Sequence, residues 1–160
     1  MTIRVGIGYD SHPFAAGRKL ILGGVDIPFE RGLDGHSDSD VLAHAIVDAL
    51  LGAAALGDIG SKFSPEDPAY KDAASTTFLR SIAALLAQHR WRIGNVDATI
   101  IAQRPKLAPH LLDMRRNVAL ALGIELAQVS VKAKSTNGLG FEGRGEGLAA
   151  QAVALLERID

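Results

Sequence analysis

Gly8-Tyr9-Asp10-Ser11-His12 ends the first apolar run of the chain, and the rest of the sequence is organised around this segment. In residues 3–7, which precede it, apolar residues alternate with polar or small ones, the period-2 pattern of a half-buried strand. Because successive side chains of a strand point to opposite faces, Asp10 and His12 should project on the same side. A carboxylate and an imidazole placed together supply two ligands of a metal site that lacks one more. On its own, such a pair is common by chance.

Composition is that of an ordinary globular protein. The 160 residues, 48% hydrophobic and 22% charged, are enough for one domain, 1–160, with a sizeable core. The formal net charge of −1 lacks the basic field of a nucleic-acid binder, and the absence of cysteine excludes disulfides and thiolate zinc sites. No apolar leader opens the chain, and its most apolar segment, 41–56, is too short to span a bilayer. We therefore expect a cytoplasmic protein with no nucleic-acid or membrane partner.

Periodicity and turn residues divide the remaining chain into short elements. Gly23-Gly24 predicts a hairpin between two apolar runs. Ser37 and Asp40 resemble a capping box, which places the start of the next helix near Ser37 and its end near Gly57. The other expected elements are a polar binding loop or lid at 57–68, helices at 75–90 and 110–122, strands at 96–101 and 129–133, and a glycine-rich segment at 138–147. Propensity alone favours a helix for the tail, 148–159.

His44 interrupts the otherwise apolar helix that follows Asp40. A lone histidine in such a place is usually a satisfied core residue, but Asp48 lies one turn later on the same face. Asp48 could hold the second ring nitrogen, as outer partners of metal-bound histidines do. With Asp10 and His12, His44 completes a set of three nitrogen and oxygen ligands. Three protein ligands and an open position are typical of a catalytic metal site.

A second polar group surrounds the glycine-rich segment. Lys132, Lys134, Ser135 and Thr136 precede it, and together they offer N–H groups, hydroxyls and cations suited to phosphate oxygens. The segment matches neither a P-loop nor a Rossmann fingerprint, and a flexible turn is the alternative interpretation. Lys106, in a loop bracketed by prolines, is either a solvated charge or a phosphate contact.

Five segments together resemble the 2-C-methyl-D-erythritol 2,4-cyclodiphosphate synthase family of the non-mevalonate isoprenoid pathway. They are Gly-Tyr-Asp-Ser-His (8–12), His-Ser-Asp-Ser-Asp (36–40), Asp-Ala-Leu-Leu-Gly-Ala-Ala-Ala-Leu-Gly-Asp-Ile-Gly (48–60), Asn-Val-Asp-Ala-Thr-Ile-Ile-Ala-Gln (95–103) and Gly-Arg-Gly-Glu-Gly (143–147). The resemblance implies an α/β (α+β) fold, with one mixed β-sheet covered by helices on one face. It also implies a strand for the tail, and a homotrimer whose sheets face the centre and whose active sites lie between subunits.

The resemblance further implies a phosphorus-oxygen lyase that converts 4-diphosphocytidyl-2-C-methyl-D-erythritol 2-phosphate to the cyclic diphosphate and releases CMP. Asp10, His12 and His44 match the family's metal ligands, usually for zinc. His36 and Ser135 match groups that act on the reacting phosphate, and Ser135 stands where threonine is most common.

The remaining matches concern the substrate. Asn137 stands where the family usually has a glutamate that helps to hold a second divalent cation, Mg or Mn, on the diphosphate. Phe141 and Arg144 match residues at the trimer centre. The positions expected to contact substrate are Asp10, His12, His36, Ser37, Asp58, Ile59, Gly60, Phe63, Asp67, Ala102, Gln103, Arg104, Pro105, Lys106, Leu107, Ala108, Ala133, Lys134, Ser135, Thr136, Asn137, Phe141 and Arg144.

Two other classes of function stay open at this point. A metal-dependent phosphohydrolase would use the same Asp/His/His set to activate water. A protein that binds the metal without catalysis would turn nothing over.

Overall fold

A five-stranded mixed sheet forms one layer of the molecule, in the strand order β4-β1-β7-β5-β6. The computed structural model describes residues 2–159. The strands are β1 (Ile3–Ala15), β4 (Gly32–Leu33), β5 (Trp91–Ile101), β6 (Val129–Lys134) and β7 (Gly147–Arg158). Only the pair β5–β6 is parallel; the other neighbours run antiparallel. A separate hairpin, β2 (Leu20–Leu22) and β3 (Val25–Ile27), turns at Gly23-Gly24 as predicted.

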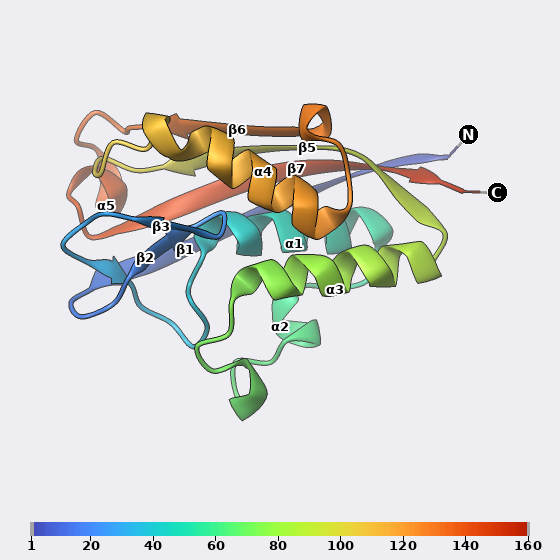
Figure 1. The fold of residues 1–160 in the computed structure, drawn as a ribbon, viewed down its shortest axis with the longest axis horizontal. Helices are drawn as coiled ribbons and strands as arrows, with labels where there is room; N and C mark the ends of the chain where they lie inside the picture. Colours follow the sequence, from blue (N-terminus) through green and yellow to red (C-terminus); the bar gives the residue numbers. More distant parts are fainter. Residues whose placement is uncertain (1, 160) are drawn as a thin grey trace.

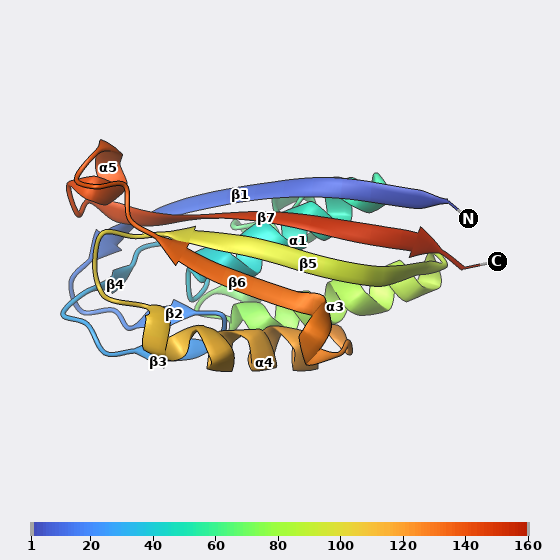
Figure 2. The ribbon, with the colours of Figure 1, turned by 90° about the horizontal axis from the view of Figure 1, so that it is seen from above.

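Among the described residues 2–159, three long helices cover one face of this sheet and no layer covers the other (Figures 1 and 2). They are α1 (Val41–Ala54), α3 (Ser75–Gln88) and α4 (Leu111–Leu122). The shorter helices are α2 (Ile59–Lys62), α5 (Gly140–Gly143) and the 3-10 turns Pro68–Tyr70, Ala108–His110 and Leu126–Gln128. The expected α+β domain, with helices on one face of a mixed sheet, is confirmed. Within residues 2–159, no helix has the length and apolar character needed to cross a bilayer.

Two glycines of β1 bring the backbone of α1 directly onto the sheet. A Cβ atom at Gly8 would lie 1.9 Å from the carbonyl oxygen of Ala45, and one at Gly6 would lie 2.0 Å from that of Ala49. The predicted strand is therefore confirmed, but its small residues face the helix. Its alternating apolar residues point to the uncovered face, where Ile3, Val5 and Ile7 are 52%, 63% and 73% exposed.

The tail forms a central strand, so the helix predicted from propensity is wrong and the strand implied by the family resemblance is confirmed. β7 pairs with β1 on one side and with β5 on the other. Ala150, Ala152, Ala154 and Leu156 alternate along it and are buried beneath the helical layer. Packing on one face and hydrogen bonds to the strands β1 and β5 outweigh the helix propensity of Ala, Leu and Glu, because the free energy of intrinsic propensity is small beside that of tertiary contacts.

Helix α1 begins later than the capping-box pattern predicted. Its N-cap is Asp40, whose side chain accepts the backbone N–H of Ala43 at 3.0 Å, so Ser37 lies ahead of the helix. The same carboxylate accepts the N–H groups of Gly23 (2.9 Å) and Gly24 (2.8 Å) from the hairpin turn. Burial raises the pKa of Asp40 to about 6. The tertiary contact with the hairpin therefore decides which of the acidic residues before α1 caps it.

Most of the remaining boundaries follow the predictions closely, with β5 as the exception. α3 and α4 begin and end within two residues of the predicted positions, and Gly123 closes α4 in a left-handed conformation. β5 begins at Trp91, earlier than expected. The polar segment 57–68 is partly ordered as the single turn α2, which Asp58 caps by accepting the N–H of Ser61 at 2.8 Å.

Candidate active site

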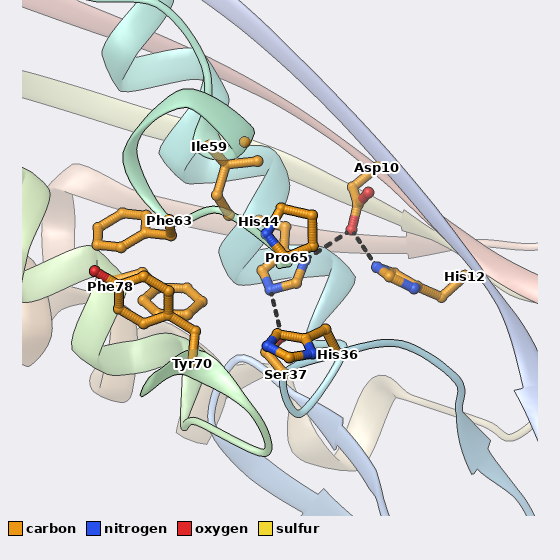
Figure 3. A pocket seen from close by; sticks show the side chains of 11 residues that line it. Asp10, His12, His36, Ser37, His44, Ile59, Phe63, Pro65, Tyr70 and Phe78 are labelled. Carbon is orange, nitrogen blue, oxygen red and sulfur yellow. Dashed lines mark hydrogen bonds and ion pairs between the residues drawn. The ribbon is translucent and has the colours of Figure 1, made fainter. Parts of the chain in front are cut away.

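Asp10, His12 and His44 meet where β1 passes the first turn of α1 (Figure 3). Oδ2 of Asp10 lies 3.0 Å from Nε2 of His12 and 3.0 Å from Nδ1 of His44. One ligand atom from each residue lies within 4.8 Å of the other two. The close packing of α1 on Gly8 brings His44 to this point. The three residues that the sequence suggested as metal ligands are therefore adjacent.

Both imidazoles are held from behind in orientations that suit metal binding. Nδ1 of His12 donates to the carbonyl oxygen of Asp34 at 2.6 Å, which leaves Nε2 directed at Asp10. Nε2 of His44 contacts the hydroxyls of Ser75 (2.8 Å) and Ser37 (3.2 Å), which leaves Nδ1 directed at Asp10. Outer hydrogen bonds of this kind fix the tautomer and ring plane of metal-bound histidines. The donor set and its supports fit a divalent cation such as zinc.

The predicted role of Asp48 is wrong. Its carboxylate accepts the backbone N–H of Ile59 at 2.7 Å, and the second ring nitrogen of His44 is held by serine hydroxyls instead. Burial raises the pKa of Asp48. Asp48 therefore ties α2 to α1 and positions the Asp58-Ile59-Gly60 segment at the edge of the site.

Asp10 and His12 stabilise each other's charged forms. Burial by itself raises the pKa of Asp10, but hydrogen bonds and charge from His12 and His44 lower it by more, so the net shift is downward. Burial likewise lowers the pKa of His12, and the hydrogen bond and charge of Asp10 outweigh it and raise the pKa. Asp10 is thus held as a carboxylate, the form that binds a cation.

A pocket of about 210 Å³ opens beside the three ligands. Its aromatic wall contains Phe63 and Phe78, stacked with centroids 4.4 Å apart, and Tyr70, which meets both rings edge-on. His36 also lines the pocket (Figure 3), and its Nε2 donates to the carbonyl oxygen of Asp67 at 2.9 Å. The predicted residues that the structure brings together here are Asp10, His12, His36, Ser37, His44, Ile59, Gly60 and Phe63.

Ten of the other predicted contacts form a second cluster, which shares no lining residue with this pocket. A pocket of about 420 Å³ is lined by Ala102, Gln103, Arg104, Pro105, Lys106, Leu107, Ala108, Ala133, Lys134 and Ser135. The N–H of Gly138 donates to the side-chain oxygen of Gln103 at 3.1 Å, which joins the loop after β5 to the loop after β6. Thr136 donates to the carbonyl oxygen of Leu139.

Ser135 and Asn137 are exposed at the end of β6, and Asn137 has a left-handed φ of 55°. Phe141 lies on α5, and Arg144 forms an exposed ion pair with Glu146 at 3.1 Å. Arg144 also lines a pocket of about 330 Å³ with Phe14, Phe29 and Arg31. In one chain, these groups and the metal ligands do not share a pocket among residues 2–159.

Several residues of the site escaped the sequence analysis. Tyr70 and Phe78 complete the aromatic wall of the pocket, and neither was among the expected contacts. Arg18 donates to the carbonyl oxygens of Gly35 (3.0 Å) and Ser37 (2.6 Å) and so fixes the loop that carries His36. Ser75 lies 31 residues from His44, and no local pattern links the two.

This α+β fold, with three side chains that could hold a metal ion at the rim of a pocket, has the features of a metal-dependent enzyme. The chain belongs to the YgbB family, whose model matches residues 3–157. The 2-C-methyl-D-erythritol 2,4-cyclodiphosphate synthase of Geobacter metallireducens is 60% identical over 156 residues, 98% of this chain and 99% of that protein. The family predicted from the sequence is confirmed, and the chain is an enzyme, a cyclodiphosphate-forming synthase of isoprenoid biosynthesis.

Solved structures agree with this assignment. The bifunctional IspDF of Campylobacter jejuni superposes with a TM-score of 0.95 at 40% identity, covering 99% of this chain and 43% of that one. The IspF of Plasmodium falciparum in complex with CDP superposes with a TM-score of 0.86 at 35% identity, covering 99% of this chain and 97% of that one.

Proposed function

We propose that this chain, as a single domain over residues 1–160, converts 4-diphosphocytidyl-2-C-methyl-D-erythritol 2-phosphate to 2-C-methyl-D-erythritol 2,4-cyclodiphosphate and releases CMP. The observation that carries the proposal is the adjacency of Asp10, His12 and His44 beside a pocket rimmed by His36, in a chain of this family. In the reaction, an oxygen of the 2-phosphate attacks the β-phosphorus, and the bond from that phosphorus to the CMP oxygen breaks. The attacking phosphate is largely ionised near neutral pH, so no general base is needed.

Asp10, His12 and His44 would hold the divalent cation, and zinc suits this donor set best. When bound, the cation would supply Lewis acidity and a template for the diphosphate oxygens. The rest of the work is positioning and charge stabilisation, which is what phosphoryl transfer requires of a protein. His36, with Nε2 held by the Asp67 carbonyl, has Nδ1 left to contact the reacting phosphate.

The nucleotide half of the substrate would be shared between the second cluster and the edge of the first pocket. Ala102 to Ala108 would enclose the cytidine, Asp58 to Gly60 would contact the ribose, and Lys106 would approach the nucleotide phosphate. Ser135 and Lys134 would stabilise charge that develops during transfer. A second cation, Mg or Mn, would be held mainly by the substrate phosphates, because Asn137 is a neutral ligand and weaker than a carboxylate.

We further propose a cytoplasmic homotrimer, packed through the uncovered face of the sheet, with active sites between subunits. Two features support this arrangement. Ile7, Val5 and Ile3 form an exposed apolar row on that face, and such rows mark interaction surfaces. The separation of the two predicted clusters within one chain also favours a site completed by a neighbouring subunit. Ile7→Glu should shift sedimentation toward monomer and abolish turnover, while Lys19→Glu, on an exposed residue outside the sheet, should do neither.

Phosphorus NMR of the products tests the reaction itself. Purified protein with zinc and magnesium should convert the diphosphocytidyl substrate to a cyclic diphosphate and CMP in equal amounts. A metal-dependent phosphohydrolase would give inorganic phosphate or a linear product, and a binding protein would leave the substrate intact. Either result would overturn the proposal.

A further inference from the structure

The ring of His44 is the end of a hydrogen-bonded chain that runs away from the pocket. Nδ1 faces Asp10 at 3.0 Å, and Nε2 lies 2.8 Å from Oγ of Ser75. The hydroxyl of Ser75 donates to Oδ1 of Asp38, and the backbone N–H of Ser75 donates to Oδ2 of the same carboxylate at 2.9 Å. The middle of this chain is enclosed, since His44 is 8% exposed and Ser75 is fully buried.

The chemistry of these groups fixes the direction of the chain. A carboxylate only accepts, so the hydroxyl hydrogen of Ser75 must point to Asp38. Oγ of Ser75 then has only lone pairs left for His44, and Nε2 of the ring must carry the hydrogen. Ser37, 3.2 Å from the same nitrogen, is a second acceptor on that side. With its hydrogen on Nε2, the ring can offer the lone pair of Nδ1 to a cation held between Asp10 and His12.

We propose that Asp38 and Ser75 are positioning residues, a relay that keeps the hydrogen of His44 on Nε2 and so holds Nδ1 as a metal ligand. The inference rests on the proposed function in one respect, that a divalent cation binds Asp10, His12 and His44. Neither Asp38 nor Ser75 lines the pocket, so both act through His44. The usual partner of a metal-bound histidine is a carboxylate or a backbone carbonyl. Here a serine hydroxyl stands between ring and carboxylate.

Asp38 also has a purely structural role, and the test must separate the two. Its backbone N–H donates to the carbonyl oxygen of Ala73 at 3.1 Å, which ties the loop before α1 to the start of α3. Its carboxylate serves as the cap of α3, because the N-cap residue Ala74 has no capping side chain. Losing a helix cap costs stability but does not by itself alter a histidine tautomer.

Asp38→Asn keeps the shape of the side chain and changes its polarity. Oδ1 of Asp38 also accepts the backbone N–H of Asp40 at 3.1 Å, so either orientation of the new amide sets its NH₂ against one backbone N–H. When the amide oxygen stays with the N–H of Ser75, the NH₂ faces Oγ of Ser75. The serine hydroxyl must then donate to Nε2 of His44, which moves the ring hydrogen to Nδ1, where it blocks the metal. We expect the dissociation constant for zinc, measured by chelator competition on the full chain, to rise about 10- to 100-fold. Ser75→Ala should weaken binding about tenfold.

Two further measurements make the result specific. In ¹⁵N-labelled apoprotein at neutral pH, the ring resonances of His44 should show hydrogen on Nε2 in the wild type, and Asp38→Asn should lose that pattern. In the Ser75→Ala background, Asp38→Asn should weaken zinc binding no further, because the relay is already broken. Thr77→Ala removes another hydroxyl from the same turn of α3, one that donates to the Ala74 carbonyl, and should leave zinc affinity unchanged.

Wild-type zinc affinity in Asp38→Asn, or an equal additional loss in the Ser75→Ala background, would overturn the relay. Failure of the proposed function gives a different result. In that case wild type and His44→Ala would bind zinc equally weakly, while the ring resonances of the apoprotein would still report whether Nε2 carries the hydrogen.

Discussion

Asp48 accepts the backbone N–H of Ile59 at 2.7 Å, while the ring of His44, one helical turn away on α1, is held by Ser75. Two polar residues on the same helical face therefore serve different parts of the site. His44 belongs to the proposed metal ligands, and Asp48 belongs to the segment expected to contact the ribose. The effects of changing them should separate in the same way.

Asp48→Ala should raise KM for the nucleotide substrate about tenfold and leave zinc affinity unchanged. The reason is that a hydrogen bond to a charged acceptor contributes about 1.5–3 kcal/mol, and its loss frees the start of α2. Asp48→Asn keeps an acceptor oxygen and is the matched control. Steady-state kinetics with metal titration would check this, and a loss of zinc from Asp48→Ala would contradict it.

His44→Ala should remove the metal and abolish turnover while the protein stays folded. The site lies at a pocket rim, and the deleted ring is one of three ligands. Elemental analysis of the purified variant, with circular dichroism for the fold, gives the result directly. His89→Ala, an exposed histidine at the end of α3, should keep its zinc. Full zinc content in His44→Ala would remove it from the ligand set.

As the pH is lowered, zinc affinity should begin to fall at a higher pH than it would for a histidine with the ordinary pKa of 6.5. Nε2 of His12 must lose its proton to bind the metal, and Asp10 raises the pKa of His12 above its ordinary 6.5 despite the opposing effect of burial. The apparent dissociation constant should therefore begin to rise as pH drops through a value above 6.5 and should increase about tenfold per further unit. Isothermal titration across pH 5–9 (about 0.5 unit apart) measures the profile. A midpoint below 6.5 would be inconsistent with this account.

Ser135→Ala should lower kcat by about a hundredfold and change substrate binding little. Losing one preorganised donor to developing charge costs about 3 kcal/mol. Ser135→Thr keeps the hydroxyl and should be nearly silent. Ser135 is exposed just after β6, and its hydroxyl makes two long contacts of 3.4 Å with Asn137, one to the side-chain oxygen and one from the backbone N–H, so it is available to substrate. If Ser135 merely ends the strand, Ser135→Ala would lower the melting temperature and leave kcat unchanged.

Ser39→Gly should stabilise the protein by about 1 kcal/mol. Ser39 is fully buried with a left-handed φ of 59°, and no group among residues 2–159 pairs with its hydroxyl. Glycine removes both the strained conformation and the buried hydroxyl, and its greater freedom in the unfolded chain offsets part of the gain. Ser39→Ala removes only the hydroxyl and should gain less. Urea midpoints at constant slope test the order; a destabilised Ser39→Gly would contradict it.

Local patterns predicted most of the secondary structure, because α3, α4 and the hairpin carry their own periodicity and turn residues. The propensity-based prediction for the tail failed because the strand β7 is stabilised by pairing with β1 and β5 and by packing against the helical layer, and none of these contacts is local in sequence. The start of α1 failed for a similar reason, since Asp40 is fixed by the hairpin turn 16 and 17 residues earlier.

The metal ligands could be proposed from the sequence because Asp10 and His12 share a strand face and His44 is an unusual residue in an apolar helix. Their outer partners could not be proposed correctly. The sequence placed Asp48 nearest to His44, yet the ring is held by Ser75, which a second helix brings in from 31 positions away. Short-range spacing therefore predicts which groups bind a ligand better than it predicts what orients them.

At Gly8 the backbones of β1 and α1 lie in direct contact, and their separation determines how far His44 lies from Asp10 and His12. α1 rests on β1 with no side chain between them at this position, and the helix carries His44 while the strand carries Asp10 and His12. A methyl group at position 8 would lift the helix and widen the triangle without altering any ligand. Preferred ligand distances run from about 2.0 Å for zinc to about 2.5 Å for calcium. A change in the spacing of the three ligand atoms should therefore change which cation fits. In the proposed metal site, Gly8 would thus influence which cation binds, although it supplies no ligand atom.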